Sequence, residues 1–208
     1  MASEANSLKS APRGYGGLLR RLCSLILKWT GWTYNLQFPD TKKFIVIGAP
    51  HTSNLDWFLM FLLTRSADLY FHWLAKDSLF RPPLGGLMRK LGGISIDRSQ
   101  RSNFVLQVIN AFKAASELII IIAPEGTRGK TKSWKSGFYY IALGANVPIV
   151  LAGIDFPTKT LTVDTWFYPS GDVKGDMDIV RTFYANKRGK YPDKQGEPRL
   201  AAEDDSIQ

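Results

Sequence analysis

The sequence is poor in metal-binding and redox-active side chains, with one cysteine and two histidines among 208 residues. The single thiol, Cys23, excludes an intrachain disulfide and gives no support for secretion. Two histidines without a cysteine–histidine cluster predict no metal site. No apolar run approaches the roughly 20 residues that a membrane-spanning helix needs. The apolar stretch that starts near Leu18 is interrupted by charges and lacks a cleavage site, so we expect no signal peptide.

Positive charge is abundant instead. The chain has 27 lysines and arginines against 18 acidic residues, which gives a formal net charge of +9. Such an excess indicates an anionic partner: nucleic acid, an anionic membrane surface or a phosphorylated substrate. No recognised nucleic-acid-binding motif accompanies the charge, so we expect no nucleic-acid partner.

Apolar runs and helical periods alternate along the chain and predict its fold. Strands are predicted at residues 43–49, 69–75, 93–97, 118–123 and 147–155, with an edge strand at 161–168. Helices are predicted at residues 54–65, 103–116, 134–143 and 172–185, with a further short helix within the proline- and glycine-containing segment 81–91. The alternation predicts a single α/β domain, with a mostly parallel or mixed central sheet and helices on both faces. Polar loops follow three of the strands, and we expect them to form one site at one edge of the sheet.

Both ends of the chain have a different composition. Residues 1–15 are predicted to be flexible, and residues 193–208 are charged and predicted to be a disordered tail. Residues 16–36 are predicted to be a basic amphipathic helix, because apolar residues recur at spacings of three and four beside Arg20, Arg21 and Lys28. Such a helix is typical of the membrane interface, although packing on its own domain explains the pattern equally well. The main domain then covers residues 37–192.

The loop after the first predicted strand of the domain holds His51 and Asp56. Five helical positions would leave the two side chains about 140° apart, so they meet only if His51 lies in the loop and a helix begins near Ser53. Asp56 would then fix one ring nitrogen and leave the other as a general base. Alternatively, Ser53 and Asp56 form only a helix-capping box, and His51 is an ordinary loop histidine.

The loop after residues 118–123 combines glycines, one hydroxyl and two cations. Thr127 and backbone amides near Gly126 are candidate donors to an oxyanion, Arg128 can grip a phosphate, and Glu125 can hold a substrate hydroxyl or orient Arg128. Further candidates for anion binding are Arg98, Arg101 and Lys135. The alternatives are a solvated basic loop and, for Arg98 and Arg101, a surface ion pair with Asp97.

Taken in order, these motifs resemble the four sequence blocks of the glycerolipid acyltransferase family, which includes lysophosphatidate acyltransferases. Residues 51–56 resemble its His-x4-Asp catalytic block, and residues 124–128 (Pro-Glu-Gly-Thr-Arg) match its third block. Residues 93–98 with Arg101 resemble the second block, which implies acceptor binding. Residues 147–150 are similar to the fourth block, which implies acyl-chain or donor binding. Residue 123 is alanine, where the family commonly has phenylalanine.

The resemblance implies that residues 37–192 are an acyltransferase domain without a cofactor. It would move a fatty acyl group from acyl-CoA or an acyl-carrier-protein thioester to an anionic lysophospholipid acceptor such as lysophosphatidic acid, in phospholipid biosynthesis. His51 and Asp56 would be catalytic, with Arg98, Arg101, Glu125, Gly126, Thr127, Arg128 and Lys135 as acceptor ligands. We expect a peripheral or monotopic protein at the cytoplasmic face of a membrane.

Three alternatives stay open from the sequence. The acceptor could be another polar lipid or a sugar headgroup, such as a lyso-ornithine lipid. A thioesterase would use water in place of the acceptor. A non-catalytic lipid-binding protein would use the basic helix alone. The apolar side chains of Trp57, Phe58, Met60 and Phe61 are interpreted as core ahead of an acyl-chain pocket.

Overall fold

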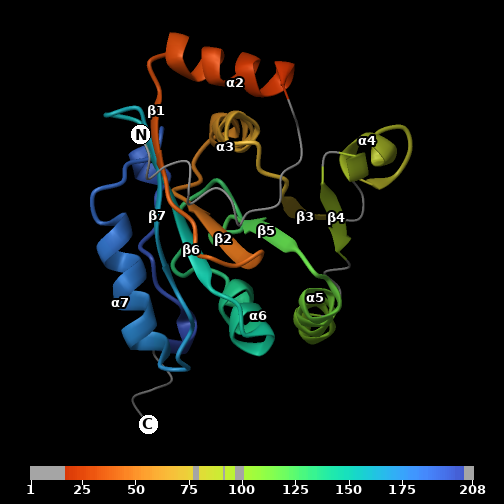
Figure 1. The fold of residues 1–208 in the computed structure, drawn as a ribbon. Coiled ribbons are helices and arrows are strands. Elements are labelled where there is room, and N and C mark those ends of the chain that lie inside the picture. Colours follow the sequence, from red (N-terminus) through yellow and green to blue (C-terminus); the bar gives the residue numbers. More distant parts are fainter. Residues whose placement is uncertain (1–16, 77–79, 91, 97–100, 204–208) are drawn as a thin grey trace.

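The computed structural model describes residues 17–76, 80–90, 92–96 and 101–203. Its centre is a seven-stranded sheet in the order β1-β7-β6-β2-β5-β3-β4 (Figure 1). The strands are β1 (Thr33–Leu36), β2 (Lys43–Ala49), β3 (His72–Lys76), β4 (Gly93–Ile96), β5 (Leu118–Ile122), β6 (Ile149–Asp155) and β7 (Thr160–Phe167). Every neighbouring pair is parallel except β6 and β7. The sheet is therefore mixed and mostly parallel, as predicted.

Helices cover both faces of the sheet, and the alternation of side chains along each strand divides the core in two. On β2, Ile45 and Ile47 face one core cluster, whereas Phe44 and Val46 face the other. The first cluster includes side chains from α5 (Arg101–Ala114), α6 (Gly137–Ala145) and α7 (Val173–Tyr184). The second includes side chains from α2 (Leu18–Trp29) and α3 (Asn54–Ser66). The continuous apolar runs in β2, β5 and β6 follow from burial on both faces.

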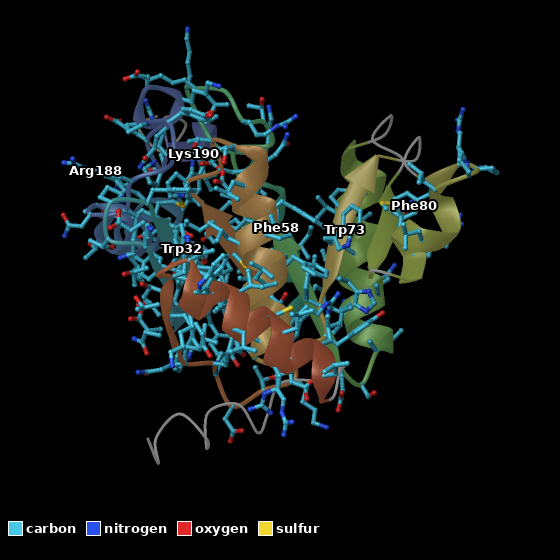
Figure 2. All side chains as sticks on the ribbon, turned by 90° about the horizontal axis from the view of Figure 1, so that it is seen from above. Trp32, Phe58, Trp73, Phe80, Arg188 and Lys190 are labelled. Atoms are coloured by element: carbon cyan, nitrogen blue, oxygen red, sulfur yellow. The ribbon has the colours of Figure 1, made fainter. Side chains whose placement is uncertain are left out.

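The N-terminal helix α2 lies across α3, as the two views of the molecule show (Figures 1 and 2). On the inner face of α2, Cys23 and Leu27 are buried, whereas Leu18, Leu22, Leu25 and Trp29 of the same helix are exposed. The predicted helix over 16–36 is wrong at its C-terminal end. It stops at Trp29, and Thr33–Leu36 form strand β1, which pairs in parallel with β7. Gly31 has a φ of +78°, which breaks the helical path between the two elements.

The strand β7 is not the edge strand that the sequence predicts. It lies between β6 and β1, with Leu161 opposite both Ile154 and Tyr34. Its inward residues, Leu161 and Val163, are buried in the core on the α2 side. The true edges of the sheet are β1 and β4.

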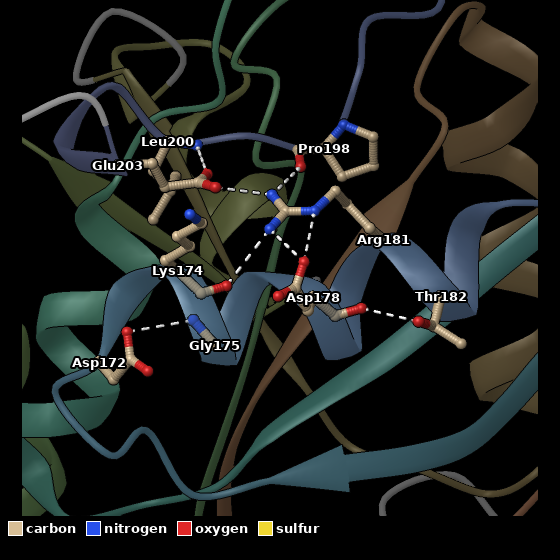
Figure 3. Close-up of polar contacts among 9 residues, drawn as sticks. All are labelled: Asp172, Lys174, Gly175, Asp178, Arg181, Thr182, Pro198, Leu200 and Glu203. Carbon is tan, nitrogen blue, oxygen red and sulfur yellow. Dashed lines mark hydrogen bonds and ion pairs between the residues drawn. The ribbon is translucent and has the colours of Figure 1, made fainter. Parts of the chain in front are cut away.

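The predicted disorder over 193–208 is wrong for the described residues 193–203. Two short 3-10 helices, Pro192–Lys194 and Ala201–Glu203, form there. Leu200 is completely buried and pairs with Trp134, and the Arg181 guanidinium binds both Glu203 and Asp178 at 2.6 Å (Figure 3). These contacts hold the charged segment, because one anchoring apolar side chain and one ion-pair network offset its polar composition. Residues 204–208 and the predicted flexible residues 1–15 lie outside the described residues.

The short helix α4 (Gly85–Lys90) stands apart from the other helices, beside β4 (Figure 1). Its main contact is with β4, and Phe80 is buried at its base beside Trp73. In the described part of the chain, no helix combines the length and the apolarity needed to cross a bilayer.

Candidate active site

The two catalytic candidates lie at the carboxyl edge of the sheet, where β2 gives way to α3. His51 follows Ala49 by two residues and stays in the loop, and Asp56 lies in the first turn of α3. His51 Nδ1 is 3.4 Å from Asp56 Oδ2. The carboxyl side chain is 2% exposed and the imidazole 25% exposed. One ring nitrogen therefore faces a buried carboxylate, and Nε2 is the nitrogen left for a substrate.

Asp56 also caps the helix that carries it. Its Oδ2 accepts the backbone N–H groups of Thr52 at 2.6 Å and Ser53 at 2.7 Å, and its Oδ1 accepts the Ser53 hydroxyl at 2.7 Å. Burial raises the pKa of this carboxyl, but the hydrogen bonds from His51, Ser53 and Thr52 outweigh burial and lower the pKa overall. The capping box and the histidine contact, which the sequence offers as alternatives, thus coexist in one carboxylate. The cap holds the charge that orients the ring.

Glu125 connects the loop after β5, which contains it, to the loop that carries His51. It follows β5 and is buried, and its Oε1 accepts the backbone N–H of His51 at 2.9 Å. Its second oxygen, Oε2, is buried and has no hydrogen-bond partner among the described residues. Burial raises the pKa of this carboxyl, against the hydrogen bond from His51. The carboxyl thus binds the backbone of His51 and positions the loop that carries it, a role that the sequence did not suggest.

Arg128 lies over the beginning of α3. Its side chain is exposed, and its Nη1 donates a hydrogen bond to Oδ1 of Asn54, the first residue of that helix. The guanidinium is therefore held near the loop that carries His51. Sequence reasoning missed Asn54, because an asparagine at the start of a helix carries no signal beyond turn and cap preference.

The rest of the Pro-Glu-Gly-Thr-Arg loop is a tight turn. Gly126 has a φ of +68°, and its N–H donates to the Ala123 carbonyl at 3.1 Å. The Gly126 amide is therefore occupied, which leaves the Thr127 amide as the candidate oxyanion donor. A Cβ on Gly126 would lie 3.2 Å from the Lys135 side chain, and the Lys135 N–H donates to the Pro124 carbonyl at 2.8 Å. Lys135 is thus brought to the same loop as Arg128.

The second sequence block is only partly within the described residues, and the fourth lies away from His51. Arg98 lies outside the described residues; Arg101 is the first residue of α5, and its side chain lies outside the described part of the structure. Residues 147–150 lead into the start of β6, at the amino-terminal ends of the strands. They lie away from His51, because Ile149 pairs with Ile45 and Gly153 with Ala49. Val147, Ile149 and Val150 are buried core residues. Among the described residues, this block packs in the core and does not line the cavity beside His51.

An apolar cavity of about 160 Å³ opens beside His51 and Asp56, between α3 and β3. His51 and Asp56 form part of its wall. The other side chains that line it are largely aromatic or aliphatic: Trp57, Met60, Phe61, Phe71, Trp73 and Ile121. Figure 2 shows Trp73 on the strand that faces α3. Trp57 and Phe58 are each 45% exposed, so their interpretation as core is corrected. Met60 packs against the core on the α3 side and also lines the cavity, as Phe61 does.

The chain is similar in sequence to several acyltransferases. Over 129 residues the chain is 31% identical to a 1-acyl-sn-glycerol-3-phosphate acyltransferase of Limnanthes alba, a match that covers 57% of this chain and 45% of that protein. Over 134 residues it is 31% identical to 1-acyl-sn-glycerol-3-phosphate acyltransferase beta of Homo sapiens, covering 62% and 47%. The chain thus spans slightly less than half the length of these curated relatives.

A solved structure and a family model complete the comparison. The crystal structure of the 1-acyl-sn-glycerophosphate acyltransferase PlsC from Thermotoga maritima superposes with a TM-score of 0.55 at 20% identity, and covers 81% of this chain and 75% of that one. This likeness establishes the fold. The model of the family described as Acyltransferase matches residues 33–154, which is more than half of the chain and includes His51, Asp56 and the Pro-Glu-Gly-Thr-Arg loop. The chain therefore belongs to the Acyltransferase family.

Proposed function

We propose that this chain transfers a fatty acyl group from an acyl thioester to a hydroxyl of a lysophospholipid. The contact of 3.4 Å between His51 Nδ1 and Asp56 Oδ2, beside an apolar cavity, carries the proposal. Membership of the family and the names of the relatives support it. The proposed donor is acyl-CoA or an acyl-carrier-protein thioester, and the proposed reaction uses no cofactor or metal.

The proposed reaction is a direct transfer between bound substrates. His51 Nε2 accepts the proton of the acceptor hydroxyl as that oxygen attacks the thioester carbonyl carbon. Asp56 stabilises the imidazolium that forms and holds the ring in place. The tetrahedral intermediate then expels the donor thiolate, which takes the proton from His51. An ester and a free thiol result, and the enzyme returns to its starting state.

The surroundings of the catalytic pair suit the two substrates. The apolar cavity offers a desolvated place for the acyl chain next to the thioester. Arg128 and Lys135 supply positive charge for the phosphate of the acceptor, with Arg98 and Arg101 as further candidates. The Thr127 amide is the candidate donor to the oxyanion.

We further propose that the protein works as a peripheral protein at the cytoplasmic surface of a membrane. The outward face of α2 carries Leu18, Leu22, Leu25 and Trp29, all exposed, with Arg20, Arg21 and Lys28 beside them. A helix with one apolar face and flanking cations binds at the boundary between headgroups and acyl chains. Because α2 packs on α3, such binding would hold the cavity close to its lipid substrates.

Substitution of the catalytic pair tests the proposed reaction. We expect His51→Ala to lower kcat for acyl transfer from palmitoyl-CoA to lysophosphatidic acid by about 10²- to 10⁴-fold, because the general base is lost. Asp56→Asn should give a similar loss and, by weakening the helix cap, cost about 1 kcal/mol of stability. Product formation is measured by mass spectrometry of the lipids, and folding by circular dichroism and thermal unfolding.

The products also separate the proposal from its rivals. Release of free fatty acid without acylated lipid would identify a thioesterase. Binding to anionic vesicles with no consumption of thioester would identify a lipid-binding protein. A fully active His51→Ala variant would refute the assignment of the base.

A further inference from the structure

A basic segment beyond the family match lies directly on the catalytic loop. We name residues 187–194 the basic strap. Gly189 is buried within it, and a Cβ at this position would lie 2.8 Å from the Thr52 side chain and 3.3 Å from Pro50. The N–H of Tyr191 donates to the Thr52 hydroxyl at 3.2 Å. Pro50 and Thr52 flank His51, so the strap contacts the loop on both sides of the catalytic base.

The backbone of the strap is held from three directions. The Arg188 N–H donates to Asp155 Oδ1 at 2.9 Å, and the Arg188 carbonyl accepts the Phe156 N–H at 2.9 Å, which ties the strap to the end of β6. The Gln195 side chain accepts the Gly189 N–H at 3.1 Å and donates to the Lys187 carbonyl at 2.8 Å. The strap is therefore pre-organised, and its charged side chains are carried on a fixed backbone.

The strap concentrates positive charge. It contains Lys187, Arg188, Lys190 and Lys194 against the single acid Asp193, a net charge of 4 − 1 = +3. Arg188, Lys190 and Lys194 are exposed, and the ammonium groups of both Lys190 and Lys194 lie over the Tyr191 ring, 5.7 and 4.7 Å from its centre. In the described part of the chain, no carboxylate forms an ion pair with any of the four cations.

The strap and the apolar cavity lie on different sides of α3, the helix that follows the His51 loop. Figure 2 shows Arg188 and Lys190 on one side of α3 and Trp73, which lines the cavity, on the other. A donor with its acyl chain in the cavity and its thioester at His51 would extend its polar end toward the strap. Lys190 directly follows Gly189, so its ammonium group reaches to roughly 10 Å from the catalytic loop.

Chemistry distinguishes the phosphate groups of the two substrates. The phosphate of a lysophosphatidate is only a few bonds from its reacting hydroxyl, so it must lie close to His51, where Arg128 and Lys135 are found. The phosphates of a coenzyme A thioester are separated from the reacting carbonyl by the whole pantetheine arm. A cation cluster set back from His51 matches the second arrangement.

We propose that the basic strap binds the phosphate groups of the acyl-CoA donor. This inference rests on the proposed function, because it assigns the polar end of the same donor. Membrane binding is a weaker explanation, because Tyr191 is the one exposed aromatic side chain of the strap, whereas α2 presents a whole apolar face.

Kinetics with two donors test this proposal. In the full chain, we expect the double variant Arg188→Gln/Lys190→Gln to raise KM for palmitoyl-CoA about 5- to 20-fold, with kcat changed less than about twofold. The thioester of palmitate with pantetheine carries no phosphate, so its KM should be the same for variant and wild type. The matched control Lys113→Gln/Lys174→Gln removes two exposed cations from α5 and the start of α7, and should leave both donors unaffected.

Binding of free coenzyme A, measured by calorimetry at low salt, provides a readout that does not depend on catalysis. The strap variant should bind it about 5- to 20-fold more weakly than the wild type and the control variant. An equal loss of activity with both donors would overturn the proposal, because the strap would then act through the catalytic loop. An increase in KM only for lysophosphatidic acid or only for an acyl-carrier-protein donor would also overturn it. So would weaker binding to anionic vesicles with no change in KM for palmitoyl-CoA. If the wild type transfers no acyl group, the proposed function fails, and coenzyme A binding still decides the role of the strap.

Discussion

At the scale of single residues, two buried carboxyl groups contact the His51 loop, and their pKa values are shifted in opposite directions. Asp56 accepts three hydrogen bonds from residues 52 and 53 and faces His51, so its ionised form is favoured. Glu125 accepts one backbone hydrogen bond, and its other oxygen has no partner among the described residues. Its neutral form is favoured, because burial without sufficient hydrogen bonding penalises charge. The first carboxyl places a negative charge beside the His51 ring, and the second holds the backbone of His51, the proposed base.

This difference predicts how stability responds to pH when Glu125 is replaced. Because the pKa of Glu125 is raised by burial, the folded protein retains this proton at a pH where the unfolded chain has lost it. The wild type therefore loses stability as pH rises from the ordinary carboxyl range through the raised pKa. Glu125→Gln can still accept the His51 N–H and has no charge to desolvate. We expect its free energy of unfolding, relative to wild type, to increase over that window.

Urea unfolding of both proteins at several values of pH from about 4 to 8 measures the difference. The contribution of Asp56 has the opposite sign, since its lowered pKa gives stability that is lost only as pH falls, and it is common to both proteins. A difference that does not change with pH would show that Glu125 is ionised without cost in the folded state.

At the scale of elements, α2 has two faces with separate tasks. Cys23 and Leu27 are 2% and 0% exposed and pack over the sheet, whereas Leu25 and Trp29 are 61% and 91% exposed. The inner face therefore contributes to folding, and the outer face is available to a membrane. The two interpretations of this helix that the sequence leaves open are both compatible with the structure, on different faces.

Substitutions on the two faces of α2 should separate these tasks. We expect Leu25→Ser/Trp29→Ser to weaken binding to anionic vesicles about tenfold or more, and to change stability by less than about 0.5 kcal/mol. Leu27→Ala should cost about 2–5 kcal/mol, because it leaves a cavity in the core, and the folded protein should still bind vesicles. Vesicle sedimentation and urea unfolding measure the two effects. Unchanged vesicle binding by the double variant would remove α2 from the membrane proposal.

At the scale of the whole molecule, the C-terminal segment around Leu200 packs into the core on the α6 and α7 side of the sheet. Leu200 is completely buried in the cluster that contains Trp134, and Trp134 packs edge-on against Tyr184 at 5.5 Å. The Tyr184 hydroxyl donates to two carbonyl oxygens of the sheet, that of Ile47 at 2.8 Å and that of Ala152 at 3.1 Å. One chain of contacts thus connects residue 200 to the strands on which the site is built.

We expect Leu200→Ala to lower the free energy of unfolding by about 2–5 kcal/mol, because it empties a fully buried position. Arg181→Ala removes the partly exposed ion pairs with Asp178 and Glu203 and should cost about 1 kcal/mol or less. Thermal and urea unfolding rank the two variants. A larger loss for Arg181→Ala would mean that the segment is held by charge and not by burial.

The sequence by itself determined the elements of the sheet that are buried on both faces, and the His51–Asp56 and Pro-Glu-Gly-Thr-Arg loops that follow two of them. Apolar runs such as residues 43–49 and 118–122 are read directly, because burial on both faces leaves no polar position in a strand. Both loops fall at the same edge, because parallel strands end together.

Only the tertiary structure decided which residues those loops meet. The strand Thr33–Leu36 finds its partner more than 120 residues later, so no local pattern separates it from the end of a helix. The same holds for Glu125 beneath His51, for Leu200 in the core and for the basic strap on Thr52. Each depends on contacts between residues distant in the chain, and hydrophobic periodicity, which reports only local geometry, carries no information about them.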